Sequence, residues 1–62
     1  MSFTVKQARL HAGKTQQEMA DILGIHVQTY RKIEGRPERA TVEQAKKISD
    51  CTGIPYDEII FV

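Results

Sequence analysis

The sequence predicts one all-α domain over residues 1–62, a compact bundle of five short helices. Three threonines each stand three residues before a Glu or Gln, the pattern of a capping box at a helix start. Four glycines follow the stretches that we expect to be helical, where a left-handed residue often ends a helix. Apolar side chains recur between these points at helical spacing.

The threonines and glycines set the limits of each helix. The capping pairs are Thr4 and Gln7, Thr15 and Glu18, and Thr41 and Gln44. The expected left-handed stops are Gly13, Gly24, Gly35 and Gly53. The predicted helices therefore cover residues 4–12, 15–23, 26–34, 41–52 and 55–61, the last opened by Pro55, which a first turn tolerates.

Apolar spacing supports the first four helices. Their shared faces are Val5, Ala8 and Ala12; Met19, Ala20 and Leu23; Tyr30 and Ile33; and Val42, Ala45 and Ile48. Residues 59–62 have high β-propensity, but four residues at a chain end do not predict a sheet.

Length and composition exclude several classes of protein. A chain of 62 residues buries only about 60% of its unfolded surface, which leaves little room for a deep catalytic pocket. No apolar run approaches the roughly 20 residues of a membrane span, and residues 1–14 lack a signal-peptide core. Cys51 is the only cysteine, as in a reduced, cytoplasmic protein. We expect no enzymatic activity and no cofactor, because no catalytic triad, Cys/His pair, carboxylate pair or Gly-rich phosphate loop appears at a plausible spacing. We expect no metal, because His11 and His26 lack partners at ligand spacing.

Charge is unevenly distributed along the chain, although the net charge is only +1. Residues 1–15 carry three basic side chains and no acid, and residues 26–39 carry four basic and two acidic ones. Residues 50–62 carry three acids and no Lys or Arg. This polarity predicts one positive face, which phosphate groups would attract.

The segment 15–34 predicts two short helices joined by a tight turn. Ala20 is small where the helices must cross, Gly24 can adopt positive φ, and Ile25 is an apolar plug in the turn. The second helix keeps an apolar inner face and a polar outer face. This arrangement is typical of helix-turn-helix DNA readers.

Residues along nearly the whole chain resemble the phage repressor/Cro-type (XRE-like) helix-turn-helix family. They are Arg9, Gly13, Thr15, Gln16, Glu18, Met19, Ala20, Leu23, Gly24, Ile25, Thr29, Ile33, Glu34, Ile59, Ile60 and Phe61. The resemblance implies a lambda repressor-like bundle of five helices. It also implies a transcription regulator, often a two-fold dimer, that binds double-stranded operator DNA.

The same resemblance assigns roles to individual residues. The recognition helix is residues 26–34, and its expected base contacts are His26, Val27, Gln28 and Lys32. The expected phosphate contacts are Gln16, Thr29, Arg31, Arg36 and Arg39. Arg9 and Glu34 are expected to form a partly buried, structural ion pair. The loop 36–39 departs from the family pattern, which leaves open which of its residues touches phosphate.

Other interpretations stand beside these. Gln16 can serve only to start a helix, Arg31 and Lys32 can be merely solvated, and the phenol of Tyr30 suits a half-buried core position. The C-terminal residues can form a homodimer interface or simply close the bundle; they are Tyr56, Ile59, Ile60, Phe61 and Val62. The alternative functions are a protein-interaction module that has lost DNA binding and an antitoxin-type component.

Overall fold

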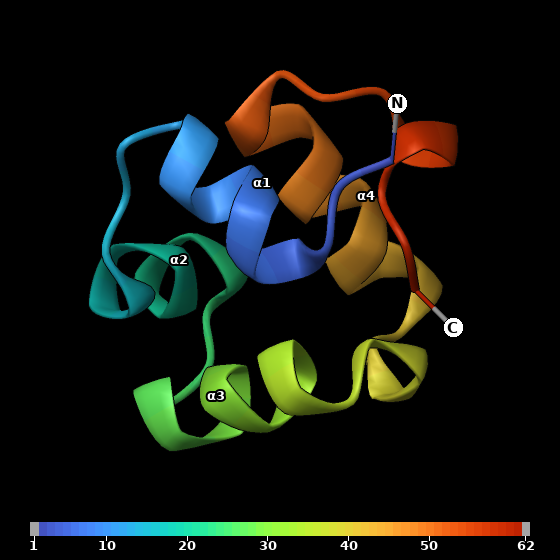
Figure 1. Ribbon diagram of the computed structural model, residues 1–62. Helices are drawn as coiled ribbons and strands as arrows, with labels where there is room; N and C mark the ends of the chain where they lie inside the picture. Colours follow the sequence, from blue (N-terminus) through green and yellow to red (C-terminus); the bar gives the residue numbers. More distant parts are fainter. Residues whose placement is uncertain (1, 62) are drawn as a thin grey trace.

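The fold is all-helical. A computed structural model describes residues 2–61 and shows four α-helices and two single turns of 3₁₀ helix (Figure 1). In chain order these are α1 (Val5–His11), α2 (Gln16–Leu23), α3 (Val27–Gly35), η1 (Pro37–Arg39), α4 (Val42–Thr52) and η2 (Tyr56–Glu58). The four α-helices agree with the predicted positions to within about one residue at each end.

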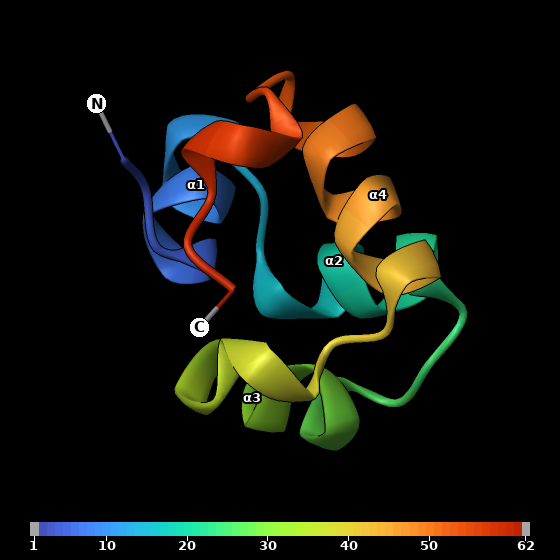
Figure 2. The same ribbon diagram turned by 90° about the vertical axis from the view of Figure 1, so that its right-hand side faces the viewer.

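The helices are arranged so that α3 forms one end of the molecule. Figures 1 and 2 both show α3 running across the bottom, with α1 and α4 above it. α2 contacts both α3 and α4, and α1 contacts the same two helices. One side of α3 therefore faces the bundle and the other faces solvent.

Residues from all four α-helices and the C-terminal segment form one core. The largest fully buried side chains are those of Val5, Met19, Tyr30 and Ile48. The smaller or slightly less buried core members are Ala8, Ala20, Leu23, Ile33, Ala45, Ile54 and Ile59. Thr52 is also buried, and its hydroxyl donates to the Ile48 carbonyl at 2.7 Å, so this polar position costs no unpaired group.

The three predicted capping boxes are confirmed. Thr15 Oγ1 accepts from the Glu18 amide at 3.1 Å, and Glu18 Oε1 accepts from the Thr15 amide at 2.8 Å. The same reciprocal pair starts α1 at Thr4 and α4 at Thr41. These helix starts are fixed by neighbours three residues apart, which explains why sequence alone locates them.

The predicted fifth helix, residues 55–61, is wrong. Only the 3₁₀ turn Tyr56–Glu58 forms, and Ile59 then becomes extended, with φ −101° and ψ 131°. The amide of Phe3 donates to the Glu58 carbonyl at 2.7 Å, and the amide of Ile60 donates to the Phe3 carbonyl at 2.8 Å. The backbone of this β-prone segment is thus paired with the N-terminal segment in an isolated parallel bridge, Phe3 to Ile59.

Two smaller expectations are also corrected. Gly13, Gly24 and Gly53 have positive φ, but Gly35 stays inside α3. That helix ends at Arg36, with φ −138°, because a residue before proline disfavours helical geometry.

Val42 does not belong to the buried face of α4 and is 65% exposed. At helical pitch it lies about 120° around the axis from Ile48, so it lies at the side of the face on which Ala45 and Ile48 are buried.

Candidate nucleic-acid interface

α2 and α3 are joined by a tight turn in which Gly24, Ile25 and Ala20 each have a distinct structural role. Gly24 ends α2 with φ 70° and ψ 33°, a conformation that costs a residue with a Cβ considerably more. The Ile25 amide donates to the Ala20 carbonyl at 3.0 Å, and its side chain packs against the core. Ala20 is fully buried, which lets the two helices approach closely.

Arg9 ties three parts of the molecule together. Its Nε donates to Glu34 Oε2 at 2.6 Å, which links α1 to α3. Its Nη1 donates to the Lys14 carbonyl at 3.0 Å, which holds the loop before α2. The Arg9 and Glu34 side chains are only 10% and 7% exposed, so the ion pair expected from the family resemblance is present and largely desolvated.

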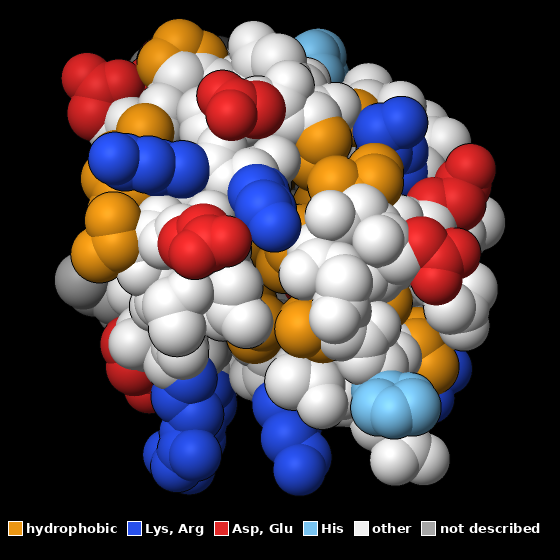
Figure 3. Space-filling model, turned by 180° about the vertical axis from the view of Figure 1, so that it is seen from behind, with side chains coloured by type: hydrophobic (Ala, Val, Ile, Leu, Met, Phe, Trp, Pro, Cys, Tyr) orange, Lys and Arg blue, Asp and Glu red, His pale blue; other side chains and the backbone are white. Residues whose placement is uncertain are grey.

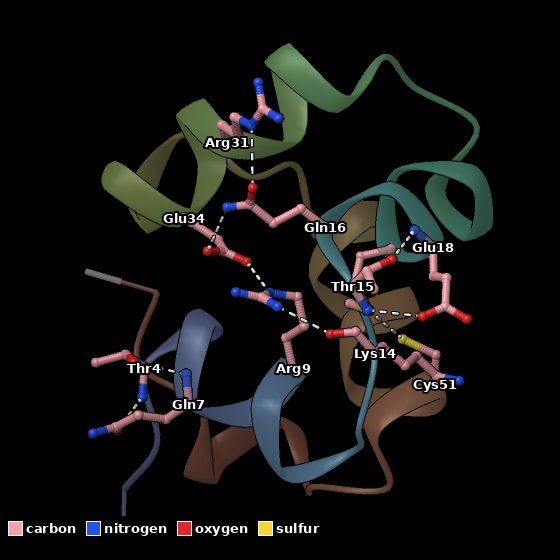
Figure 4. Close-up of polar contacts among 11 residues, drawn as sticks. Thr4, Gln7, Arg9, Lys14, Thr15, Gln16, Glu18, Arg31, Glu34 and Cys51 are labelled. Carbon is pink, nitrogen blue, oxygen red and sulfur yellow. Dashed lines mark hydrogen bonds and ion pairs between the residues drawn. The ribbon is translucent and has the colours of Figure 1, made fainter.

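Gln16 extends this pair to the surface of α3. Its Nε2 donates to Glu34 Oε1 at 3.2 Å, and its Oε1 accepts from Arg31 Nε at 3.1 Å. Figure 4 shows the resulting chain of four side chains, from Arg9 through Glu34 and Gln16 to Arg31. The start of α2 is thereby fixed relative to the middle of α3.

These contacts determine the protonation of Glu34. Burial alone would raise its pKa, but the neighbouring Arg9, Tyr30 and Gln16 side chains outweigh burial and hold the pKa below its ordinary value. Burial raises the pKa of Tyr30, and the Glu34 carboxylate acts in the same direction. The Tyr30 hydroxyl is buried without a hydrogen-bond partner among residues 2–61, and the side chain belongs fully to the core.

The expected base-contact residues differ in how they lie. Gln28 and Lys32 are exposed on α3, and His26 is exposed just before it. The side chain of His26 makes no capping hydrogen bond. Val27 is half-buried and packs against the core, so much of its side chain faces away from solvent.

Positive charge collects around α3 and the turn that follows it. Lys32, Arg36 and Arg39 line a shallow hollow together with Gly35. Figure 3 shows Lys and Arg side chains along the lower edge of the molecule, the end where α3 lies, whereas basic and acidic side chains are interspersed above. Since the charge of Glu34 is compensated by Arg9, Glu38 is the main acid left among residues 26–39.

The expected phosphate contacts form two groups. Gln16 and Arg31 are hydrogen bonded to each other at the start of α2, and Arg36 and Arg39 flank η1 beyond the end of α3. Thr29 is exposed on α3. Sequence reasoning missed that Gln16 bridges Glu34 and Arg31; the signal available was only that all three are polar and lie in the same motif.

The C-terminal residues do not form a single surface. Ile59 is 5% exposed and belongs to the core, so the expectation that it contributes to a dimer interface is wrong. Tyr56 and Ile60 are 46% and 38% exposed, and the Tyr56 ring stacks on Phe61 with centroids 5.3 Å apart. Val62 lies outside the described residues.

Residues 2–61 contain neither a cluster of metal ligands nor a membrane-spanning helix. In this part of the chain no three His, Cys, Asp or Glu side chains are grouped so that they could hold a metal ion. None of its helices combines the length and the apolar character needed to cross a bilayer.

Known proteins match both the motif and its surroundings. Residues 5–59 match the Helix-turn-helix family, and this range includes all four α-helices and both 3₁₀ turns. The chain is 41% identical over 46 residues to the cryptic phage CTXphi transcriptional repressor RstR of Vibrio cholerae serotype O1. That match covers 74% of this chain and 41% of the relative, so the chain spans about two fifths of the relative's length. No solved structure matches. The chain therefore belongs to the helix-turn-helix family, in its phage repressor/Cro-type branch.

Proposed function

We propose that this protein binds specific sequences in double-stranded DNA and regulates transcription, as a repressor. The observation that carries the proposal is the exposed face of α3, which is polar, flanked by cations and held rigidly on α2. A helix presented in this way fits the major groove, where each base pair displays a distinct set of donors and acceptors. The name of the Vibrio relative, a transcriptional repressor, supports the same function.

The residues divide into those that would read bases and those that would bind the backbone. Gln28 can form two hydrogen bonds with adenine, and Lys32 can reach the guanine O6 or N7 atoms. His26 stands at the N-terminal end of the helix, where base edges are approached first. Because Val27 packs inward, we assign it at most an edge contact with a thymine methyl group.

Cations on either side of α3 would hold the phosphates. Arg31 lies by the start of α2, and Arg36 and Arg39 lie beside the hollow near η1. Such contacts fix the orientation of the protein on the duplex without reading its sequence. Thr29 is exposed on α3 and can donate to a further phosphate. A protein with this activity would act in the cytoplasm, on nucleoid or phage DNA.

The decisive experiment is selection of binding sites from random duplex DNA at a fixed salt concentration. We expect a defined consensus, and Gln28→Ala should relax the preference at one position by about 1–3 kcal/mol. Lys46→Ala, at an exposed position of α4, is the control and should leave the consensus unchanged. Failure to enrich any sequence, with no salt-dependent binding, would contradict DNA binding and favour a protein-interaction module.

We further propose that the protein acts as a homodimer through Tyr56, Ile60 and Phe61. The Tyr56 and Phe61 rings stack on each other, and Ile60, the neighbour of Phe61 in the chain, is also exposed. A two-fold dimer would place two copies of α3 on half-sites about one helical turn apart. A palindromic consensus would support this arrangement.

The test is the mass of the protein in solution, free and on DNA. Ile60→Lys should shift a dimer to the monomer and weaken binding to a palindrome, while Val42→Lys, which also replaces an exposed aliphatic residue, should not. A wild-type chain that stays monomeric on its palindromic site would contradict the proposal.

A further inference from the structure

Gln16 uses both ends of its side-chain amide within the protein. Its oxygen accepts from Arg31 Nε at 3.1 Å, and its nitrogen donates to Glu34 Oε1 at 3.2 Å. A guanidinium can only donate and a carboxylate can only accept, so the partners themselves fix which way the amide points. The oxygen and the nitrogen of the side chain that was expected to clamp a phosphate are therefore each bonded within the protein, which leaves Gln16 a single side-chain N–H donor.

Arg31 has the opposite arrangement, with one end held and the other free. Only its Nε is bonded to Gln16; the four N–H groups of its two terminal nitrogens make no hydrogen bond within residues 2–61. Figure 4 shows these two nitrogens directed away from Gln16 and Glu34. A guanidinium with its terminal nitrogens free is suited to paired hydrogen bonds with phosphate oxygens.

We propose that Gln16 is a positioning residue for Arg31, and that Arg31 rather than Gln16 clamps a DNA phosphate near the start of α2. The inference depends on the proposed DNA binding. Gln16 holds Arg31 through Nε, Glu34 holds Gln16, and the largely buried Arg9 holds Glu34. A guanidinium fixed before DNA arrives loses less side-chain entropy on binding, which strengthens the complex.

A double-mutant cycle separates this role from direct contact. The probe is a mixed-sequence DNA duplex at low salt, because phosphate contacts do not depend on sequence. Gln16→Ala should weaken binding by about threefold to tenfold in the wild-type background. It should cost no further affinity when Arg31 is already Ala. Independent, multiplicative losses would show that Gln16 touches the DNA itself and would overturn the inference.

The salt dependence gives a second readout that a purely structural role would not move. Arg31→Ala should reduce the slope of log K against log salt by about 0.9, the value for one phosphate. Gln16→Ala should move the slope toward that of Arg31→Ala, although Gln16 carries no charge. Weaker binding of Gln16→Ala with an unchanged slope would contradict positioning.

Arg31→Lys tests the same point without disturbing the contact between Gln16 and Glu34. Lysine keeps the charge but has no Nε to bond Gln16, so binding should fall by more than for Arg39→Lys, because Arg39 forms no side-chain hydrogen bond within residues 2–61. Equal losses would overturn the inference. If the wild-type chain fails to bind the duplex at all, the proposed function fails and the inference with it; additive losses in a chain that binds would refute positioning alone.

Discussion

The two helices of the motif begin in opposite ways. At α2, Thr15 and Glu18 satisfy each other's backbone groups, and this bond to the Thr15 amide lowers the pKa of Glu18. At α3, His26 occupies the N-cap position and its side chain makes no capping hydrogen bond. Histidine is not among the residues preferred there. The start of α2 thus follows the capping preferences of helices, whereas α3, the helix proposed to read DNA, departs from them at the position proposed to lie nearest the bases.

The largest expected effect is a loss of stability when the ion pair between Arg9 and Glu34 is broken. Arg9→Ala would leave the carboxylate of Glu34 largely buried without its cation, which typically costs about 3–5 kcal/mol of unfolding free energy. Urea denaturation measures this loss. Arg31→Ala is the matched control and should change stability by less than about 0.5 kcal/mol, because Arg31 is exposed. Equal midpoints for wild type and Arg9→Ala would show that the pair does not stabilise the motif.

The same pair should make stability depend on acid. The pKa of Glu34 is lower in the folded chain than its ordinary value of 4.5, so its contribution is complete above that value and is lost as pH falls through the folded pKa. We expect the unfolding free energy to decline more steeply below about pH 4.5 in wild type than in Glu34→Gln. Parallel pH profiles for the two proteins would contradict a coupled, charged Glu34.

A smaller loss is expected at the start of α2. Thr15→Ala removes the hydroxyl that accepts from the Glu18 amide and should cost about 1 kcal/mol of stability. Thr29→Ala, at an exposed position inside α3, is the control and should be close to neutral. Thermal or urea unfolding would distinguish the two, and indistinguishable losses would mean that the cap contributes nothing beyond helix propensity.

The smallest expected effect is a gain in stability at the start of α3, in contrast to the losses expected at α2. His26→Ser supplies the missing cap of α3 and should stabilise the fold by about 0.5–1 kcal/mol. If His26 contacts a base, the same variant should bind the selected DNA more weakly despite its greater stability. A variant that gains both stability and affinity would remove His26 from the proposed site.

Features that depend on residues close together in the sequence could be predicted, whereas features that depend on residues far apart in the sequence could not. The starts of α1, α2 and α4 depend on contacts between residues three apart, and all three were predicted. The extended C-terminal segment was not predictable in the same way, because Ile59 and Ile60 are paired with Phe3 across nearly the whole chain. The Gln16 bridge joins residues 15 and 18 positions away, so helical spacing cannot reveal it. The ion pair of Arg9 and Glu34 was expected only because the sequence resembles a known family.

The bridge between Phe3 and Ile59 also has a consequence for how the protein is degraded. Its two backbone hydrogen bonds close a loop of nearly the entire chain. Because closing so long a loop is entropically costly and two bonds offset little of that cost, we expect the bridge to open before the core does. We expect opening to withdraw Ile59 from the core and to release the Phe3 and Ile59 segments from each other. The segments around Phe3 and Ile59 are thus expected to open together, and a protease that recognises either segment would encounter it in the same transient state.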